Sequence, residues 1–372
     1  MVERQKFLPG MELAERFFEE VVEPIIGELN PDLSYSAGLI GPGSEVLGFD
    51  NEMSSDHHWG PRVMIFLKED EYEQLSGSMK VVLSHKLPHR FLGYPTSFTP
   101  AGGDTGNACV QLLDYDNEGL VNHRVEIYSF SQFIESYIGV GSGLNEPLKV
   151  QDWLVIPQQK LRSLKSGRLF RDDLELSLKL SKIDYYPHDL WLYLLASCWM
   201  RIEQAEHLMG RAGDVGDEIG SSLIAAGLVR DLMRLSFFME KQYPPYEKWF
   251  GTAFGRLKIA MFLKPHLEST LKSETWQDRE RCLAKAYKVV AEQHNELGIT
   301  APLPVEARPF HDRPYKVISM GDYSSAIKQE IKDADVLKLT QTRLLGNVDL
   351  MSDSTDVSES LFAQGVFKQL YI

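Results

Sequence analysis

Residues 36–62 read SAGLIGPGSEVLGFDNEMSSDHHWGPR, and this stretch decides how the first part of the chain is expected to fold. A short strand is expected over residues 33–40, and the run Gly41–Ser44 ends it, because glycine and proline interrupt regular structure. The apolar run Val63–Leu67 follows directly and is typical of a strand at the centre of a sheet. The stretch therefore predicts two strands joined by a glycine-containing turn and a polar loop.

The residues on either side add helices and further strands. Between Met11 and Leu29 the apolar residues recur at three- and four-residue steps, which predicts a helix with one buried face. Further strands are expected over Lys80–Ser84 and Val121–Tyr128, and the glycine-, proline- and threonine-rich segment Gly93–Asn107 between them is typical of a loop. This mixture predicts an α+β domain over residues 1–145, built on a mixed sheet with flanking helices.

Beyond the glycine-rich segment Gly139–Gly143 the sequence changes to helical periodicity. The expected helices cover residues 189–209, 221–240, 253–271, 277–297 and 323–333. Most are long and carry a regular apolar stripe, which is typical of helices that pack against one another. We therefore expect a second, all-α helical bundle domain over residues 146–372.

Composition limits the possible partners and compartments. The chain has 372 residues and a formal net charge of -14, which disfavours a broad basic surface and therefore excludes duplex DNA as an expected partner. Three widely separated cysteines, Cys109, Cys198 and Cys282, argue against a disulfide framework and favour a reducing cytoplasm. No apolar run approaches the roughly 18 residues of a membrane span, so we expect no membrane partner.

The chemistry of residues 36–62 points to phosphate and a metal ion. Gly43 lets the backbone approach a ligand closely, and Ser44 is a good helix N-cap, so the amides of this turn can hold a phosphate. Asp56 stands twelve positions after Ser44 and can hold Mg²⁺ against the same phosphates. Glu126, on an alternating later strand, can supply another acidic ligand. The same residues are also found in plain turns, in solvated loops and on exposed strand faces.

The Gly-Ser turn, the spaced acidic residue and the acidic residue on a later strand resemble the polymerase-β-like nucleotidyltransferase superfamily. Further stretches resemble a bacterial branch of predicted nucleotidyltransferases with a helical C-terminal domain; they are residues 56–62, 185–187, 210–217, 243–251 and 313–315. The resemblance spans most of the chain. It implies a nucleotidyltransferase-like sheet followed by a helical domain, and the metal-dependent transfer of a nucleoside monophosphate from an NTP to a hydroxyl or amine acceptor.

The expected catalytic residues are Asp56 and Glu126, which together with His58 form the expected metal site for Mg²⁺ or Mn²⁺. The expected nucleotide-binding residues are Gly43, Ser44, Arg62, Arg211 and Lys248. Each cation has an alternative role. Arg62 can be a surface charge, the stretch that holds Arg211 can be a loop in which Asp217 only caps a helix, and Lys248 lies beside Trp249, which can simply pack into the bundle.

His58 departs from the pattern of the superfamily. The superfamily has two carboxylates two residues apart, and His58 stands where the second is expected. Imidazole is a poorer ligand for Mg²⁺ than carboxylate and prefers softer metals. The alternative is therefore a catalytically degenerate nucleotide sensor or protein-interaction module, and a metal-dependent phosphohydrolase is a third reading. ATP is the expected nucleotide, and the acceptor can be a small molecule, a protein or a tRNA end.

Overall fold

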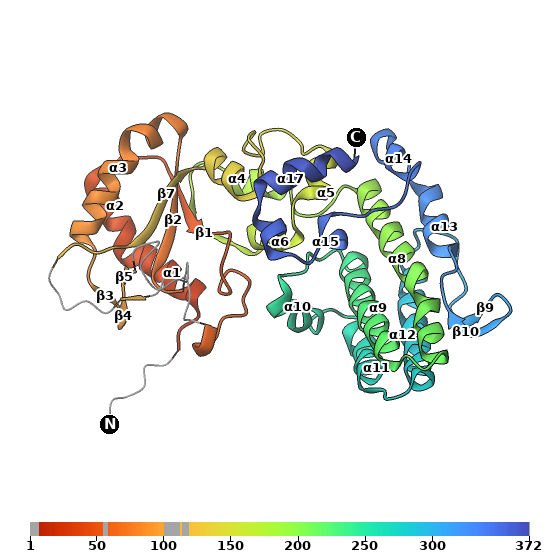
Figure 1. Ribbon diagram of the computed structural model, residues 1–372. Helices are drawn as coiled ribbons and strands as arrows, with labels where there is room; N and C mark the ends of the chain where they lie inside the picture. Colours follow the sequence, from red (N-terminus) through yellow and green to blue (C-terminus); the bar gives the residue numbers. More distant parts are fainter. Residues whose placement is uncertain (1–6, 55–58, 100–111, 114–118, 372) are drawn as a thin grey trace, which may run out of the picture. The chain divides into compact units, whose positions relative to one another are not determined.

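The computed structural model describes residues 7–54, 59–99, 112–113 and 119–371 (Figure 1). The chain forms two compact units. The first consists of Met1–Leu148 and Lys160–Asp184, and the second of Lys149–Gln159 and Tyr185–Ile372. The structure is a mixed α+β fold with a small mixed sheet and many helices, as the sequence predicts.

The first unit is built around a four-stranded sheet with the strand order β7-β2-β1-β8. Its strands are β1 (Ser36–Leu39), β2 (Arg62–Leu67), β7 (Arg124–Ser129) and β8 (Arg168–Asp172). β2 and β7 run parallel, whereas β1 is antiparallel to both of its neighbours. β8 comes from the part of the chain that the sequence assigns to the helical domain, so residues 160–184 complete the first unit.

Helices bury one face of this sheet. α1 (Gly10–Phe17) and α2 (Glu23–Leu29) are joined by the π-helical turn Phe18–Val22, which confirms the helix expected over residues 11–29. They share a core with α3 (Glu69–Lys86) and with alternate residues of the strands, among them Val125 and Ile127 of β7. The intervening residues of β7 therefore lie on the opposite face of the sheet.

One of the expected strands is instead part of α3. Residues 80–84, which were expected to form a strand because of Val81 and Val82, lie inside this helix. Three acidic residues fill its first turn and His85 and Lys86 its last, a charge distribution that complements the helix dipole. Val81 is 58% exposed, so it does not contribute to a buried strand.

Several short elements complete the first unit and the connection between the two units. The strands are β3 (Arg90–Phe91), β4 (Tyr94–Pro95), β5 (Ser97–Phe98) and β6 (Leu112–Leu113). The helices are a 3₁₀ turn (Glu52–Ser54), α4 (Phe130–Ile138), α5 (Val150–Val155), α6 (Gln158–Ser166) and α7 (Leu176–Ser181).

The second unit is a helical bundle around α8 (His188–Asp214), α9 (Glu218–Met239) and α12 (Trp276–Glu296), which pack against one another (Figure 1). α11 (Ala260–Lys272) packs against α9 and α12. The helix expected over residues 253–271 is confirmed from residue 260 on but starts too early, because α10 (Glu247–Phe254) ends before Gly255 and tight turns precede α11.

Beyond residue 300 the structure contains a hairpin that the sequence did not predict, formed by β9 (Arg308–Phe310) and β10 (Arg313–Val317). Pro309 and Pro314 are both exposed in this two-stranded ribbon, where proline is tolerated. The last helices are α13 (Asp322–Glu330), α14 (Ala334–Thr340), α15 (Val348–Met351), α16 (Thr355–Glu359) and α17 (Leu361–Phe367), followed by a 3₁₀ turn (Lys368–Tyr371). Among the helices of the described residues, none is long and apolar enough to cross a membrane.

Candidate functional site

The turn after β1 has a backbone conformation that only glycine adopts without strain. Gly43 has φ +143°, and a Cβ atom at this position would lie 2.4 Å from Nη2 of Arg62 and 2.6 Å from Oε2 of Glu45. The missing side chain therefore lets two charged groups approach the backbone of the turn directly.

Those two groups form a buried ion pair. Nη2 of Arg62 lies 2.6 Å from Oε1 of Glu45, and the Nε of Arg62 donates to the same oxygen at 2.8 Å. Nη2 also donates to the carbonyl oxygen of Pro42 at 2.6 Å. Glu45 is 3% and Arg62 7% exposed. Arg62, expected to contact the nucleotide, thus holds the Pro42–Gly43 backbone in place from the first residue of β2.

Ser44 does not begin a helix. Residues 44–48 form successive turns, in which the N–H of Phe49 donates to the carbonyl oxygen of Ser44 at 2.9 Å. The expected helix cap at Ser44 is therefore wrong, although the residue does follow β1 in a tight turn. Asp50 comes next and is structural, because its Oδ2 accepts from the N–H of Gly10 and from Nε1 of Trp59.

Glu126 lies on the same face of the sheet as Arg62. In the parallel register Arg62 pairs with Arg124 and Met64 with Glu126, so Glu126 lies two residues further along this face. Glu126 is half-buried. Burial raises the pKa of Tyr128, the next residue on this face, to about 12, and the negative charge of Glu126 acts in the same direction.

Asp56 and His58 lie outside the described residues. The chain on either side of them is buried, since Ser54 is 7% and Trp59 3% exposed, and β2 begins at Arg62. Of the three expected metal ligands the described ranges include Glu126, and within these ranges no group of three or more ligating side chains is placed to hold a metal.

The other two expected nucleotide-binding residues belong to the second unit. Arg211 is exposed in the last turn of α8, so residues 210–214 are helical and not a loop. Asp217 caps α9, because its side chain accepts from the N–H of Gly220. Lys248 is exposed near the start of α10, with its Nζ 5.1 Å from the ring centroid of Trp249.

A pocket of about 440 Å³ opens at the carboxyl ends of the parallel strands β2 and β7, where ligands often bind in sheets of this kind. Its charged lining comes from Lys68 and Glu69 after β2, from Asp173 and Glu175 after β8, and from Lys179 of α7. The Nζ of Lys179 also lies 5.5 Å from the ring centroid of Phe130. The sequence reasoning missed this pocket, and none of the expected site residues lines it.

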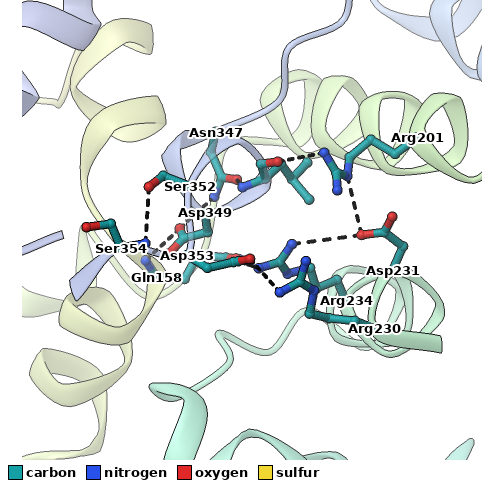
Figure 2. Close-up of polar contacts among 11 residues, drawn as sticks. Gln158, Arg201, Arg230, Asp231, Arg234, Asn347, Asp349, Ser352, Asp353 and Ser354 are labelled. Carbon is teal, nitrogen blue, oxygen red and sulfur yellow. Dashed lines mark hydrogen bonds and ion pairs between the residues drawn. The ribbon is translucent and has the colours of Figure 1, made fainter. Parts of the chain in front are cut away.

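A polar cluster in the second unit was also missed (Figure 2). Arg201 of α8 pairs with Asp231 of α9 at 3.3 Å and donates to the carbonyl oxygen of Leu350 at 2.8 Å. Arg230 and Arg234 of α9 both bind the carboxylate of Asp353. Every charge in this group has a partner, so the cluster fastens the segment 347–354 to α8 and α9. We therefore interpret it as structural.

Asp349 lies in the same segment, 347–354, and is partly buried beside this cluster. Its Oδ2 accepts from the backbone N–H of Gln158 and from Nδ2 of Asn347, each at 3.0 Å (Figure 2). Burial raises its pKa to about 6, although the hydrogen bond from Gln158 and the positive charge of Arg234 act in the opposite direction. Burial therefore favours the neutral form of this carboxyl group.

Comparison with known proteins gives one match. Residues 153–250 are similar to a family described as a domain of unknown function (DUF4037). This segment contains α8 and α9 with Arg201, Arg230, Asp231 and Arg234. No curated protein and no solved structure matches the chain.

Proposed function

We propose that the chain is a metal-dependent nucleotidyltransferase, which transfers a nucleoside monophosphate from an NTP to a hydroxyl or amine acceptor. One observation carries this proposal. Arg62, which fixes the glycine turn after β1, and Glu126 lie on the same face of the sheet. The segment with Asp56 and His58 lies between that turn and β2 in the chain. In this proposal the amides of the turn, the acidic ligand of the loop and Glu126 of the strand serve one site.

In this proposal each residue has a distinct role. The amides of Gly43 and Ser44 bind the phosphates of the nucleotide, and Arg62 acts by keeping their turn in place. Asp56, His58 and Glu126 would hold Mg²⁺ or Mn²⁺, which when bound neutralises negative charge on the phosphate oxygens. The half-buried position of Glu126 fits such a role, because water on that face is already partly excluded.

Nucleotide binding is tested by calorimetric titration of the full chain with a non-hydrolysable ATP analogue, in Mg²⁺, in Mn²⁺ and in EDTA. We expect binding that requires the metal and that is lost in Asp56→Ala and weakened in Glu126→Gln. Asp32→Ala, at an exposed position outside the site, is the matched control. Binding that is equally strong in EDTA, or unchanged in Asp56→Ala, would overturn the proposed site.

Turnover separates the transferase from a nucleotide sensor. The transferase releases pyrophosphate from ATP when an acceptor is present, whereas a sensor with the degenerate site binds ATP without releasing it. His58→Asp restores the second carboxylate, so we expect it to strengthen Mg²⁺-dependent binding. Unchanged dependence on Mg²⁺ in His58→Asp would remove His58 from the metal site. Release of free phosphate without transfer would instead support the phosphohydrolase.

A further inference from the structure

A second pocket, of about 360 Å³, lies within the second unit. It is bounded by α8, by the β9–β10 hairpin and by Met320, which precedes α13. Its main lining residues are Met200, Glu203, His207, Phe310, His311 and Met320. The volume is in the range that proteins use to bind small molecules.

Glu203 lines this pocket and carries a carboxylate oxygen without a hydrogen-bond donor among the described residues. This oxygen, Oε2, is buried. Glu206 lies one turn further along α8 and differs from Glu203 in this respect. Its carboxylate accepts from the backbone N–H groups of residues 318, 319 and 320. A buried acceptor without a donor costs free energy in the absence of a ligand. A bound ligand could therefore supply the donor that the described residues do not provide to Glu203.

The charges around Glu203 leave it without a strong counterion. Burial raises the pKa of Glu203, and the negative charge of Asp322 acts in the same direction, while Lys328 acts weakly against them. Asp322 is itself paired with Arg308. A cation that entered the pocket would favour the ionised form of Glu203 and pair with it.

Aromatic rings form part of the wall of the pocket. The ring of His207 stacks on Phe310 with 4.3 Å between centroids and 13° between planes, and the His311 ring is 4.6 Å from Phe310. Met200 and Met320 add flexible, polarisable side chains. His311 and Met320 have φ of +55° and +46°, a strained conformation for residues other than glycine and one often found at functional sites.

We propose that this pocket binds a small planar organic cation of the amidinium or guanidinium class, with its N–H groups donating to the carboxylate of Glu203. A planar fork of donors matches a carboxylate in a two-hydrogen-bond arrangement, and its face can lie against aromatic rings and methionine. A divalent metal is disfavoured, because in the described part of the chain no three ligating side chains converge. The proposal concerns only the second unit and does not depend on the nucleotidyltransferase site.

The ligand class is tested with two probes of nearly the same shape. Benzamidine carries the planar cation, and benzamide is its neutral counterpart. Saturation-transfer NMR and calorimetry on the full chain at pH 7 should show that benzamidine binds and that benzamide binds at least about tenfold more weakly. Equal binding of both probes, or binding of neither, would overturn the proposal, and so would Glu203-dependent binding of Zn²⁺ in place of benzamidine.

Variants assign the binding to this pocket. Glu203→Gln keeps the shape of the side chain and removes its charge, so benzamidine affinity should fall by about tenfold or more. Glu330→Gln, at an exposed position of α13, is the matched control and should bind as the wild type does. Benzamidine affinity unchanged in a folded Glu203→Gln protein, as judged by circular dichroism, would place the binding elsewhere.

Discussion

Arg62 and Glu45 form an ion pair inside the first unit, with 2.6 Å between Nη2 of the arginine and Oε1 of the glutamate. The pair connects the first residue of β2 to the turn that follows β1. It also explains why position 43 is glycine, because any side chain there would collide with the guanidinium. The geometry of the proposed phosphate-binding turn therefore depends on the Arg62–Glu45 pair, even if neither residue contacts a nucleotide.

Removal of one partner should destabilise the first unit strongly. Arg62→Met leaves the buried carboxylate of Glu45 without its cation, which typically costs about 3 kcal/mol or more. The double variant Arg62→Met/Glu45→Gln should recover part of this loss, because no charge is then left unpaired. Urea unfolding of the three proteins measures the difference. A single variant within about 1 kcal/mol of the wild type would contradict the stabilising role of the pair.

Gly43→Ala should impair both the fold and nucleotide binding, because the new methyl group would meet Nη2 of Arg62 and must displace it. Gly48→Ala is a matched control in the same loop. Gly48 also has a positive φ, +69°, but a Cβ there has no other atom within 4 Å. We expect about 1 kcal/mol of destabilisation in the control and a clearly larger effect, with loss of ATP-analogue binding, in Gly43→Ala. Equal effects of the two substitutions would show that the contact with Arg62 is unimportant.

Asp349 should make the stability of the second unit depend on pH. Its pKa is raised from 3.8 to about 6 by burial, so the folded chain binds the proton more tightly than the unfolded chain does. This group therefore costs almost nothing below pH 4, becomes destabilising as the pH rises from about 4 to 6, and costs about 3 kcal/mol at pH 7.

Asp349→Asn removes the charge and keeps an oxygen that can accept from Gln158 or Asn347. Its free energy of unfolding should exceed that of the wild type at pH 7 and approach it at pH 4. Denaturation curves over this range measure the difference. A constant difference across the range would mean that Asp349 does not titrate there.

Asp353 should make stability depend on pH in the opposite direction from Asp349. Burial alone would raise its pKa, but the hydrogen bond and positive charge of Arg234 outweigh burial, with help from Arg230, and the pKa is lowered. Its contribution is therefore present at neutral pH and is lost as the pH falls. Because Asp353 is partly exposed, Asp353→Asn should cost about 1 kcal/mol or less at pH 7, and less still in high salt. An effect that is insensitive to both pH and salt would exclude an electrostatic origin.

The sequence predicted those elements whose periodicity directly reflects burial. The opening helix, β2 and the long helices α8, α9 and α12 each carry a regular apolar pattern that matches the buried face found in the structure. Residues 80–84 misled because two adjacent valines favour a strand locally, although their neighbours continue a helix of 18 residues. The local strand preference of these residues gave the wrong prediction because the surrounding helical sequence determines the structure.

For the candidate site, the sequence predicted which residue types take part but not how they contact one another. The sequence indicated that Gly43 allows close approach, but not that the approaching group is Arg62 held by Glu45, because a contact over 17 residues leaves no periodic signal. The two pockets and the arginine cluster combine residues from distant segments; the cluster, for example, joins Arg201 to Leu350. Such sites depend on tertiary packing, which a single sequence does not reveal.

The position of β8 in the sequence affects how the first unit folds during synthesis. It pairs with β1, yet it is separated from the rest of the sheet by the segment 149–159, which belongs to the other unit. During synthesis the sheet therefore cannot close until residue 172 has left the ribosome, and until then β1 presents a bare edge that can pair with other chains. A fragment that ends at residue 148 should aggregate for the same reason, so an expression boundary for this unit must lie after residue 184.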